Sequence, residues 1–299
     1  MNEALALELK DIVKKRRRKT IGPINLQIPQ GYIVALVGTN GSGKSTILHM
    51  LTRSLIPDEG EIKWFGEKSA GDLPQEIRSK MAYVSENPVA EENYQTAEQA
   101  ASFRAHWYPS WDQKKFERLM THFEVPRKER LNRMSKGERR KFEVAAALAT
   151  SPKLLILDEL SSGLDPFVWK DMLEELQESM MGEDVTIIMA THIVEEVKRL
   201  ADYIVLVHQG KVLGMVEKDL LYGSCYEAWV GGDLGEWKGR PELIRCDEDG
   251  PSMHKLIVRN EAFISELQQS KDLQVKRTRA LELEEVLELW IQGYAPEYK

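Results

Sequence analysis

The stretch Gly38-Thr39-Asn40-Gly41-Ser42-Gly43-Lys44-Ser45-Thr46 decides the fold. It follows an apolar run, Ile33–Val37, and precedes a helical pattern that begins at Ile47. Between a strand and a helix, the spacing G-x-x-x-x-G-K-[ST] is typical of a phosphate-binding loop. Its glycines let backbone N–H groups turn toward phosphate oxygens, and the helix directs its positive end at the same place. The sequence therefore predicts a nucleoside triphosphate site, with Lys44 on the outer phosphates and the Ser45 hydroxyl on Mg²⁺. A chance glycine-rich turn is the alternative, and the flanking strand and helix disfavour it.

Composition is that of a globular protein. The chain has 299 residues, of which 42% are apolar and 30% charged, as in soluble domains. No apolar run approaches the roughly 20 residues that span a bilayer, and we see no secretory signal. Cys225 and Cys246 are expected to be free thiols of a cytoplasmic protein. A net charge of −7 argues against nucleic acid as the main partner.

Strands alternate with helices up to about residue 215, which predicts a mostly parallel sheet covered on both faces. The core strands are expected at Ile33–Val37, Met81–Val84, Leu154–Leu157, Val185–Met189 and Tyr203–Val207. We expect an antiparallel β subdomain near the N-terminus and a helical subdomain at about 88–150. Residues 216–299 are expected to form a small C-terminal α+β appendage without a catalytic constellation.

Three finer expectations concern local structure. The basic run Lys14–Lys19 is interpreted as a solvated hairpin tip, with contact to nucleotide or to anionic lipid as alternatives. Trp107, Tyr108 and Trp111 are expected to form an aromatic core of the helical region. In the C-terminal part, Gly231 and Gly232 are expected to lie in a loop.

A second chemical site is predicted at Leu154-Leu155-Ile156-Leu157-Asp158-Glu159. Adjacent carboxylates at the end of a buried strand cost desolvation unless a cation lies there. We expect Asp158 to hold Mg²⁺ and Glu159 to act as general base toward water. His192 follows the next strand, and parallel strand ends meet at one edge, so His192 is a candidate for contacting the γ-phosphate or the water. An acidic surface strand end and a structural histidine are the alternatives.

The run Ser135-Lys136-Gly137-Glu138 begins a predicted helix. Serine with glutamate three residues later forms a capping box, which explains both residues structurally. A glycine in the first helical turn nevertheless costs about 1 kcal/mol relative to alanine. We therefore expect something to approach the backbone there, and a helix N-terminus suits a phosphate.

Taken together, these residues resemble the ATPase subunit of ATP-binding cassette (ABC) transporters, over roughly Leu5 to Val216. Gly38–Thr46 resembles the Walker A loop, and Leu154–Glu159 resembles Walker B with its catalytic glutamate. Ser135–Glu138 stands where the family has its signature, and His192 where it has its switch histidine. Ser161-Ser162-Gly163-Leu164-Asp165-Pro166 is similar to the D-loop, with Asp165 also expected as a helix N-cap. A weaker likeness, around Tyr108 to Asp112, is to small bacterial exporter ATPases.

The resemblance implies a P-loop NTPase fold and an ATPase that uses ATP and Mg²⁺. It implies a head-to-tail dimer with a second copy or a related chain, in which Ser135, Gly137 and Glu138 of one copy close over the ATP of the other. It also implies a separate membrane permease that docks between Glu86 and Thr150, which would hold the chain at the inner face of the cell membrane.

Four features of the sequence depart from the family pattern. Glu86 replaces a glutamine, and we expect it still to ligate Mg²⁺. Arg16 and Arg17 stand where an aromatic residue usually stacks on adenine, and a guanidinium plane can take that role. Lys136 and Glu138 alter the signature but leave Ser135 and Gly137. Leu160 replaces a proline, a change we expect to matter little.

Two other functions remain open at this stage. The chain could be an ABC-type ATPase that is not tied to transport, although such proteins usually carry two cassettes or long coiled coils. It could also be a nucleotide-gated binding module with weak hydrolysis, although Lys44, Asp158, Glu159 and His192 argue against that.

Overall fold

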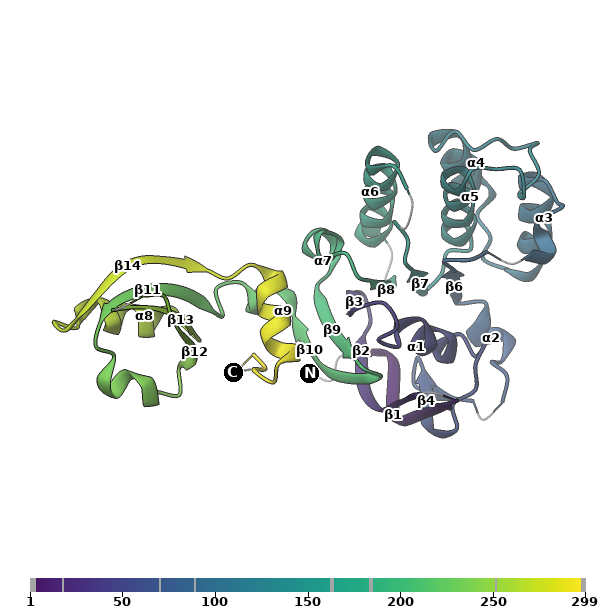
Figure 1. Cartoon of the computed structure of the whole chain (residues 1–299). Helices are drawn as coiled ribbons and strands as arrows, with labels where there is room; N and C mark the ends of the chain where they lie inside the picture. The colour runs from purple at the N-terminus through teal and green to yellow at the C-terminus, as the bar shows by residue number, and fades with distance from the viewer. Residues whose placement is uncertain are drawn as a thin grey trace. The chain divides into compact units, whose positions relative to one another are not determined.

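The computed structural model describes residues 4–17, 19–69, 71–88, 90–161, 164–182, 185–250 and 252–296. It divides into two compact units, Met1–Met215 and Val216–Lys299 (Figure 1). Arg18 of the basic run and Ser162 and Gly163 of the D-loop stretch lie outside the described residues.

A six-stranded sheet in the order β10-β9-β3-β8-β7-β6 forms the centre of the first unit. The pairs β3–β8, β3–β9, β7–β8 and β6–β7 are parallel, which confirms the predicted core sheet. The strands are β3 (Ile33–Val37), β6 (Met81–Val84), β7 (Leu154–Asp158), β8 (Thr186–Thr191), β9 (Tyr203–His208) and β10 (Lys211–Glu217). Because β3, β7 and β8 are adjacent and parallel, the residues that follow them meet at one edge of the sheet.

A four-stranded antiparallel sheet packs against this centre. Its order is β2-β1-β4-β5, from β1 (Leu5–Arg16), β2 (Lys19–Pro29), β4 (Glu59–Trp64) and β5 (Glu67–Lys68). Arg16 pairs with Lys19 across the β1–β2 hairpin, so the basic run does lie at a hairpin tip. A buried apolar cluster joins these strands to the core strands and to α1 (Lys44–Leu51), which lies between the two sheets (Figure 1).

The helical region contains α3 (Ala97–Trp107), α4 (Gln113–His122) and α5 (Lys136–Ala149). Thr96, Asp112 and Ser135 accept hydrogen bonds from first-turn N–H groups and so fix where the three helices begin. The remaining helices of the first unit are α2 (Gln75–Arg78), the 3-10 turn Ala90–Glu92, α6 (Pro166–Gly182) and α7 (Val194–Leu200).

Trp107 is 54% exposed, so the prediction that it belongs to an aromatic core of this region is wrong. Helix α3 instead buries its small residues, Ala97, Ala100 and Ala101. Tyr108 and Trp111 are only partly buried. The aromatic side chains at the end of α3 are therefore available on the surface.

The second unit is an antiparallel sheet, β12-β13-β11-β14, with helices α8 and α9. Its elements are the 3-10 turns Lys218–Leu221 and Gly235–Gly239, β11 (Tyr226–Gly232), β12 (Leu243–Glu248), β13 (Met253–Val258), α8 (Glu261–Gln269), β14 (Leu273–Ala280) and α9 (Leu283–Ile291). Gly231 and Gly232 end β11 rather than forming a loop, because they pair with Met253 and Leu273 of neighbouring strands. Cys225 and Cys246 are free thiols, as expected. In the described ranges, no helix is long and apolar enough to cross a bilayer.

Candidate functional site

The phosphate-loop stretch connects β3 to α1 in a conformation that needs its glycines. A Cβ at Gly38 would lie 2.2 Å from the carbonyl oxygen of Val207, so only glycine fits there. Gly43 has φ 122° at the position just before α1, a backbone region that L side chains rarely adopt. The tight turn brings Lys44 back over the loop, where its ammonium donates to the Gly38 carbonyl oxygen at 2.7 Å.

Asp158 ends β7 directly opposite Ser45. The Ser45 hydroxyl donates to Asp158 Oδ1 at 3.2 Å, and the Tyr83 hydroxyl donates to Oδ2 at 3.5 Å. Burial, together with the nearby carboxylates of Glu159 and Glu86, raises the pKa of Asp158. A buried carboxylate with other carboxylates beside it is stabilised by a cation, so this position fits a metal ion.

Glu159 is held between a lysine and a histidine. Its carboxylate lies 3.3 Å from Lys44 Nζ through one oxygen and 2.7 Å from His192 Nδ1 through the other. Its backbone is left-handed, with φ 47°, and its N–H donates to the carbonyl oxygen of Ala190 on β8. Left-handed backbone costs a non-glycine residue about 1 to 2 kcal/mol, and here it turns the Glu159 side chain toward the phosphate loop. The three strand ends thus bring Lys44, Glu159 and His192 together, as predicted.

These groups open into a cavity of about 440 Å³. Its lining includes most of the predicted loop residues and Glu86, Glu159, His192 and Arg16. Arg17 is exposed and is not among the lining residues. Of the two arginines proposed to stack on adenine, the structure therefore places only Arg16 at the site.

Sequence reasoning missed two residues that hold the loop. Lys19 lines the cavity, and its ammonium donates to the carbonyl oxygens of Gly41 at 2.7 Å and Ser42 at 3.1 Å. The Gly210 N–H donates to the same Ser42 oxygen at 2.7 Å. Lys19 belongs to the basic run Lys14–Lys19, for which the sequence leaves nucleotide contact as one alternative, but nothing in the run distinguishes Lys19 from its neighbours. Gly210 is recognisable only as a hairpin turn between β9 and β10.

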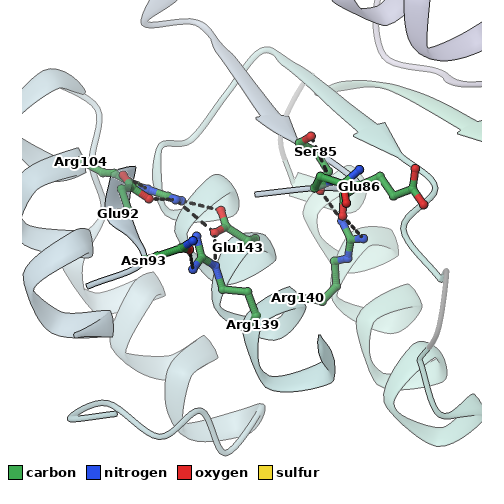
Figure 2. A network of polar contacts seen from close by, with 9 residues as sticks. Ser85, Glu86, Glu92, Asn93, Arg104, Arg139, Arg140 and Glu143 are labelled. Carbon is green, nitrogen blue, oxygen red and sulfur yellow. Dashed lines mark hydrogen bonds and ion pairs between the residues drawn. The ribbon is translucent and has the colours of Figure 1, made fainter. Parts of the chain in front are cut away.

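Glu86 follows β6, and its side chain lines the cavity. Its backbone is bound by a residue of α5. Arg140 of α5 donates to the carbonyl oxygens of Ser85 at 2.6 Å and Glu86 at 3.2 Å (Figure 2). Burial lowers the pKa of Arg140. The backbone at Glu86 is thereby attached to α5, the helix whose N-cap is Ser135.

The residues at the start of α5 lie outside the nucleotide cavity. Ser135 and Glu138 form the predicted capping box, with Ser135 N–H donating to Glu138 Oε2 at 2.8 Å. That backbone bond, with the Ser135 hydroxyl, lowers the pKa of Glu138. A Cβ at Gly137 would meet no atom nearer than 3.9 Å, so packing within this chain does not require the glycine.

Asp165 has the structural role that was expected. Its carboxylate accepts the Phe167 N–H at 2.8 Å just before α6 begins at Pro166. The hydroxyl of Ser161, four residues earlier, is hydrogen-bonded to Glu196 of α7. Neither residue lines the nucleotide cavity.

The residues at the cavity fit a magnesium ion brought with a nucleotide better than a metal held by protein alone. Across the described ranges, no three or more His, Cys, Asp or Glu side chains cluster closely enough to hold a metal ion. Ser45 and Asp158 supply two oxygen atoms within 3.2 Å of each other, and Glu86 lines the same cavity. Mg²⁺ takes one or two carboxylates and completes its shell with phosphates and water.

Comparison with known proteins agrees with the geometry. A family model described as "ABC transporter" matches residues 21–162. The phosphonates import ATP-binding protein PhnC of Treponema denticola is 30% identical over 226 residues, 70% of this chain and 88% of that protein. The lantibiotic transport ATP-binding protein SrtF of Streptococcus pyogenes is 32% identical over 217 residues, 71% of this chain and 91% of that protein.

Solved structures give the same result. The structure of an ATP-binding subunit of an ABC transporter superposes with a TM-score of 0.64 at 29% identity, covering 72% of this chain and 91% of that one. The predicted family and the predicted α/β P-loop NTPase fold are therefore confirmed.

Proposed function

This chain belongs to the ATP-binding subunits of ABC transporters, and from that premise we propose how its own residues bind and hydrolyse ATP. Members of the family are ATPases. The observation that carries the assignment of roles is the convergence of Lys44, Glu159 and His192 on one 440 Å³ cavity.

In this proposal the loop from Gly38 to Thr46 binds the phosphates through its backbone N–H groups. Lys44 exchanges the Gly38 carbonyl for a phosphate oxygen. Glu159 accepts a proton from the attacking water, a role that contributes typically 10²–10⁴-fold in rate. His192, 2.7 Å from Glu159, keeps that carboxylate in place and contacts the water or the γ-phosphate.

Ser45 and Asp158 would hold the magnesium ion, with Glu86 as a further ligand. When bound, the ion neutralises charge on the phosphate oxygens. The raised pKa of Asp158, caused chiefly by burial and also by the charges of Glu159 and Glu86, supports this assignment, because a cation stabilises the charged form of a buried carboxylate. Arg16 is the residue we propose to lie against adenine, and its place in the cavity lining supports that choice over Arg17.

We further propose that the site is completed by a second ABC ATPase chain, identical or related. Ser135 and Gly137 lie outside the cavity of their own chain, and the atom nearest to a Cβ position at Gly137 is 3.9 Å away, which supports the approach of a phosphate held by another subunit. Glu138 caps the start of α5. Asp165 holds the start of α6, and the preceding residue, Leu164, lies 3.9 Å from a Cβ position at Gly137.

A separate integral membrane permease would be driven by this binding and hydrolysis of ATP. It would also hold the chain at the inner face of the cell membrane. The names of the relatives support a transport partner: PhnC is named for phosphonate import and SrtF for lantibiotic transport. These names favour transport over an ABC-type ATPase with another task.

The variant Glu159→Gln tests the proposal. It keeps the shape of the side chain but cannot take a proton, so phosphate release from Mg·ATP should fall at least about 100-fold. ATP should still bind and should trap a dimer that size-exclusion chromatography detects. A variant that stays monomeric with ATP and fully active would refute the assigned roles. A wild-type chain that binds ATP but releases no phosphate would instead favour a nucleotide-gated binding module.

A further inference from the structure

A second cavity, of about 370 Å³, lies beside the start of α5 and next to the nucleotide cavity. Its wall is formed by the segment after β6, by residues just before α5 and by the first turns of α5. Glu86 lines both this cavity and the nucleotide cavity, so the two adjoin at that residue. We call the second one the α5 cavity.

The lining of the α5 cavity is positively charged. Lys136, Arg139 and Arg140 all contribute to it from the first turns of α5. Glu86 is the one carboxylate among the lining residues, and its side chain also reaches the nucleotide cavity, where we propose that it binds the metal. Three cations against one carboxylate make the α5 cavity suitable for an anion.

Arg140 is a buried cation that binds neutral groups. It is 2% exposed, and it donates to the backbone carbonyl oxygens of Ser85 and Glu86 (Figure 2). Across the described ranges Arg140 forms no ion pair, and burial lowers its pKa. A buried charge without an opposite charge close to it is destabilising. An anion in the α5 cavity would therefore stabilise the charged form of Arg140.

Arg139 has unused hydrogen-bonding capacity at the same cavity. Its Nε donates to Glu143 at 2.7 Å, and its Nη1 donates to Asn93 Oδ1 at 3.2 Å (Figure 2). The side chain is only 8% exposed, and its buried Nη2 has no hydrogen-bond partner among the residues that the structure describes. A buried donor without an acceptor is unfavourable, so an oxygen atom of a ligand would complete the bonding of Arg139.

The carboxylates around Arg139 are already in use. Glu143 binds both Arg104, at 2.8 Å, and Arg139, while Glu92 binds Arg104 at 2.5 Å (Figure 2). Burial alone would raise the pKa of Glu143, but Arg104 and Arg139 lower it. These two carboxylates offset the charges of Arg104 and Arg139 and leave none for Arg140.

We propose that the α5 cavity binds inorganic phosphate, the anion that ATP hydrolysis produces in the adjoining cavity. This inference rests on the proposed function and adds a second anion site to the same chain. Arg139 and Arg140 donate to the phosphate oxygens, because a planar guanidinium fits pairs of oxygen atoms on a phosphate. Lys136 adds an exposed positive charge.

A carboxylate side chain of another protein is the alternative occupant. Phosphate is favoured because it carries more than one negative charge near neutral pH, whereas a carboxylate carries one. It is also produced on the other side of Glu86, so it needs no further partner to reach the α5 cavity.

The first experiment is equilibrium dialysis of the full chain against radiolabelled inorganic phosphate. A non-hydrolysable ATP analogue fills the phosphate loop as far as the γ position, so phosphate that binds must occupy another site. The wild type should bind phosphate under these conditions. Arg139→Gln should raise the Kd for phosphate about tenfold or more, because it removes a charged donor from a shielded site. Lys136→Gln should raise it about two- to fivefold, because an exposed charge contributes less.

Lys141→Gln is the matched control, because Lys141 is a neighbouring cation of α5 that lines neither cavity. Its Kd for phosphate should equal that of the wild type. A cooperative thermal transition reports that each variant folds, and Lys136→Gln tests the site at an exposed position if Arg139→Gln does not fold. The inference is overturned if the wild type binds no phosphate beside the analogue or if neither substitution weakens binding. It is also overturned if acetate displaces phosphate at equal concentration, since the site would then favour a carboxylate.

The second experiment connects the α5 cavity to the reaction in a single turnover of ATP. Rapid quenching measures ADP formation, and a fluorescent phosphate-binding protein reports phosphate that has left the chain. Free phosphate should appear after ADP in the wild type, and Arg139→Gln should shorten that delay. Equal delays in the two proteins would overturn the inference. A wild-type chain that forms no ADP would instead overturn the proposed function, because the dialysis experiment does not depend on hydrolysis.

Discussion

Lys19 offers a sharp test of how the phosphate loop is positioned. Its ammonium joins the tip of the β1–β2 hairpin to the loop through the carbonyl oxygens of Gly41 and Ser42. Lys19→Met keeps most of the aliphatic stem and removes both hydrogen bonds. Because Gly210 N–H still donates to Ser42 and water can reach the exposed Gly41, the loop should remain folded but less well fixed.

The size of the effect follows from those two contacts. A hydrogen bond from a charged group contributes about 1.5–3 kcal/mol when it is well shielded, and exposed contacts contribute less. The Ser42 carbonyl oxygen keeps the Gly210 N–H as a partner, and the Gly41 oxygen is accessible to water. We therefore expect the binding free energy of ATP to weaken by about 1–2 kcal/mol. This corresponds to a Kd for ATP about 5- to 30-fold higher.

The assay is equilibrium titration with ATP, accompanied by steady-state phosphate release. Lys19 contacts the loop backbone rather than the reacting phosphate, so KM should rise while kcat changes little. Lys15→Met is the control, because Lys15 lies on the same hairpin but pairs with Glu59 at the surface. A Lys19→Met protein whose Kd and KM stay within about twofold of the wild type would refute the positioning role.

Three further predictions concern the same cavity. Arg16→Ala should raise the Kd for ATP about two- to fivefold through loss of a cation over the base, whereas Arg17→Ala should not; equal effects in a titration would contradict the choice of Arg16. Glu86→Gln should raise the Mg²⁺ concentration needed for half-maximal phosphate release, and an unchanged rate and Mg²⁺ dependence would show that Glu86 is not a ligand. Because the folded state raises the pKa of Asp158, its contribution to stability is present at acid pH and lost as pH rises through the folded pKa. The nucleotide-free Asp158→Asn variant should therefore have a higher Tm than the wild type, and the difference in Tm should grow as pH rises from about 4. A difference in Tm that shrinks over this range would contradict the prediction.

The central fold, and the placement of most candidate site residues at one cavity, could be predicted from the sequence because phosphate chemistry dictates residue types at fixed spacing. Gly38 and Gly43 are needed by the backbone itself, and two carboxylates at the end of a buried strand favour a cation beside them. Parallel pairing of β3, β8 and β7 then places the residues after each strand at one edge. Local pattern and topology therefore agree on the position of Lys44, Glu159 and His192.

Other features depend on which surfaces meet, and sequence pattern does not report that. Lys19 differs from Lys15 only in where the hairpin tip lies relative to the loop. Trp107 was expected inside because aromatic residues bury large areas, but α3 packs through alanines. β11 was missed because its final glycines resemble a turn, although cross-strand pairing on both sides holds them in the sheet.

Glu138, which replaces the glutamine of the family signature, is compatible with the proposed site that two chains form together. A glutamate in place of a glutamine would place a negative charge near a phosphate, which is unfavourable on its own. Here the Glu138 carboxylate accepts the Ser135 N–H at 2.8 Å and closes the capping box, and the positive end of α5 offsets part of its charge. Glutamate and glutamine are equivalent in that box, so the substitution keeps the helix start that orients Ser135. A side chain at position 137 would obstruct an approaching phosphate, whereas the glycine that stands there has no Cβ, and the atom nearest to the position of one is 3.9 Å away.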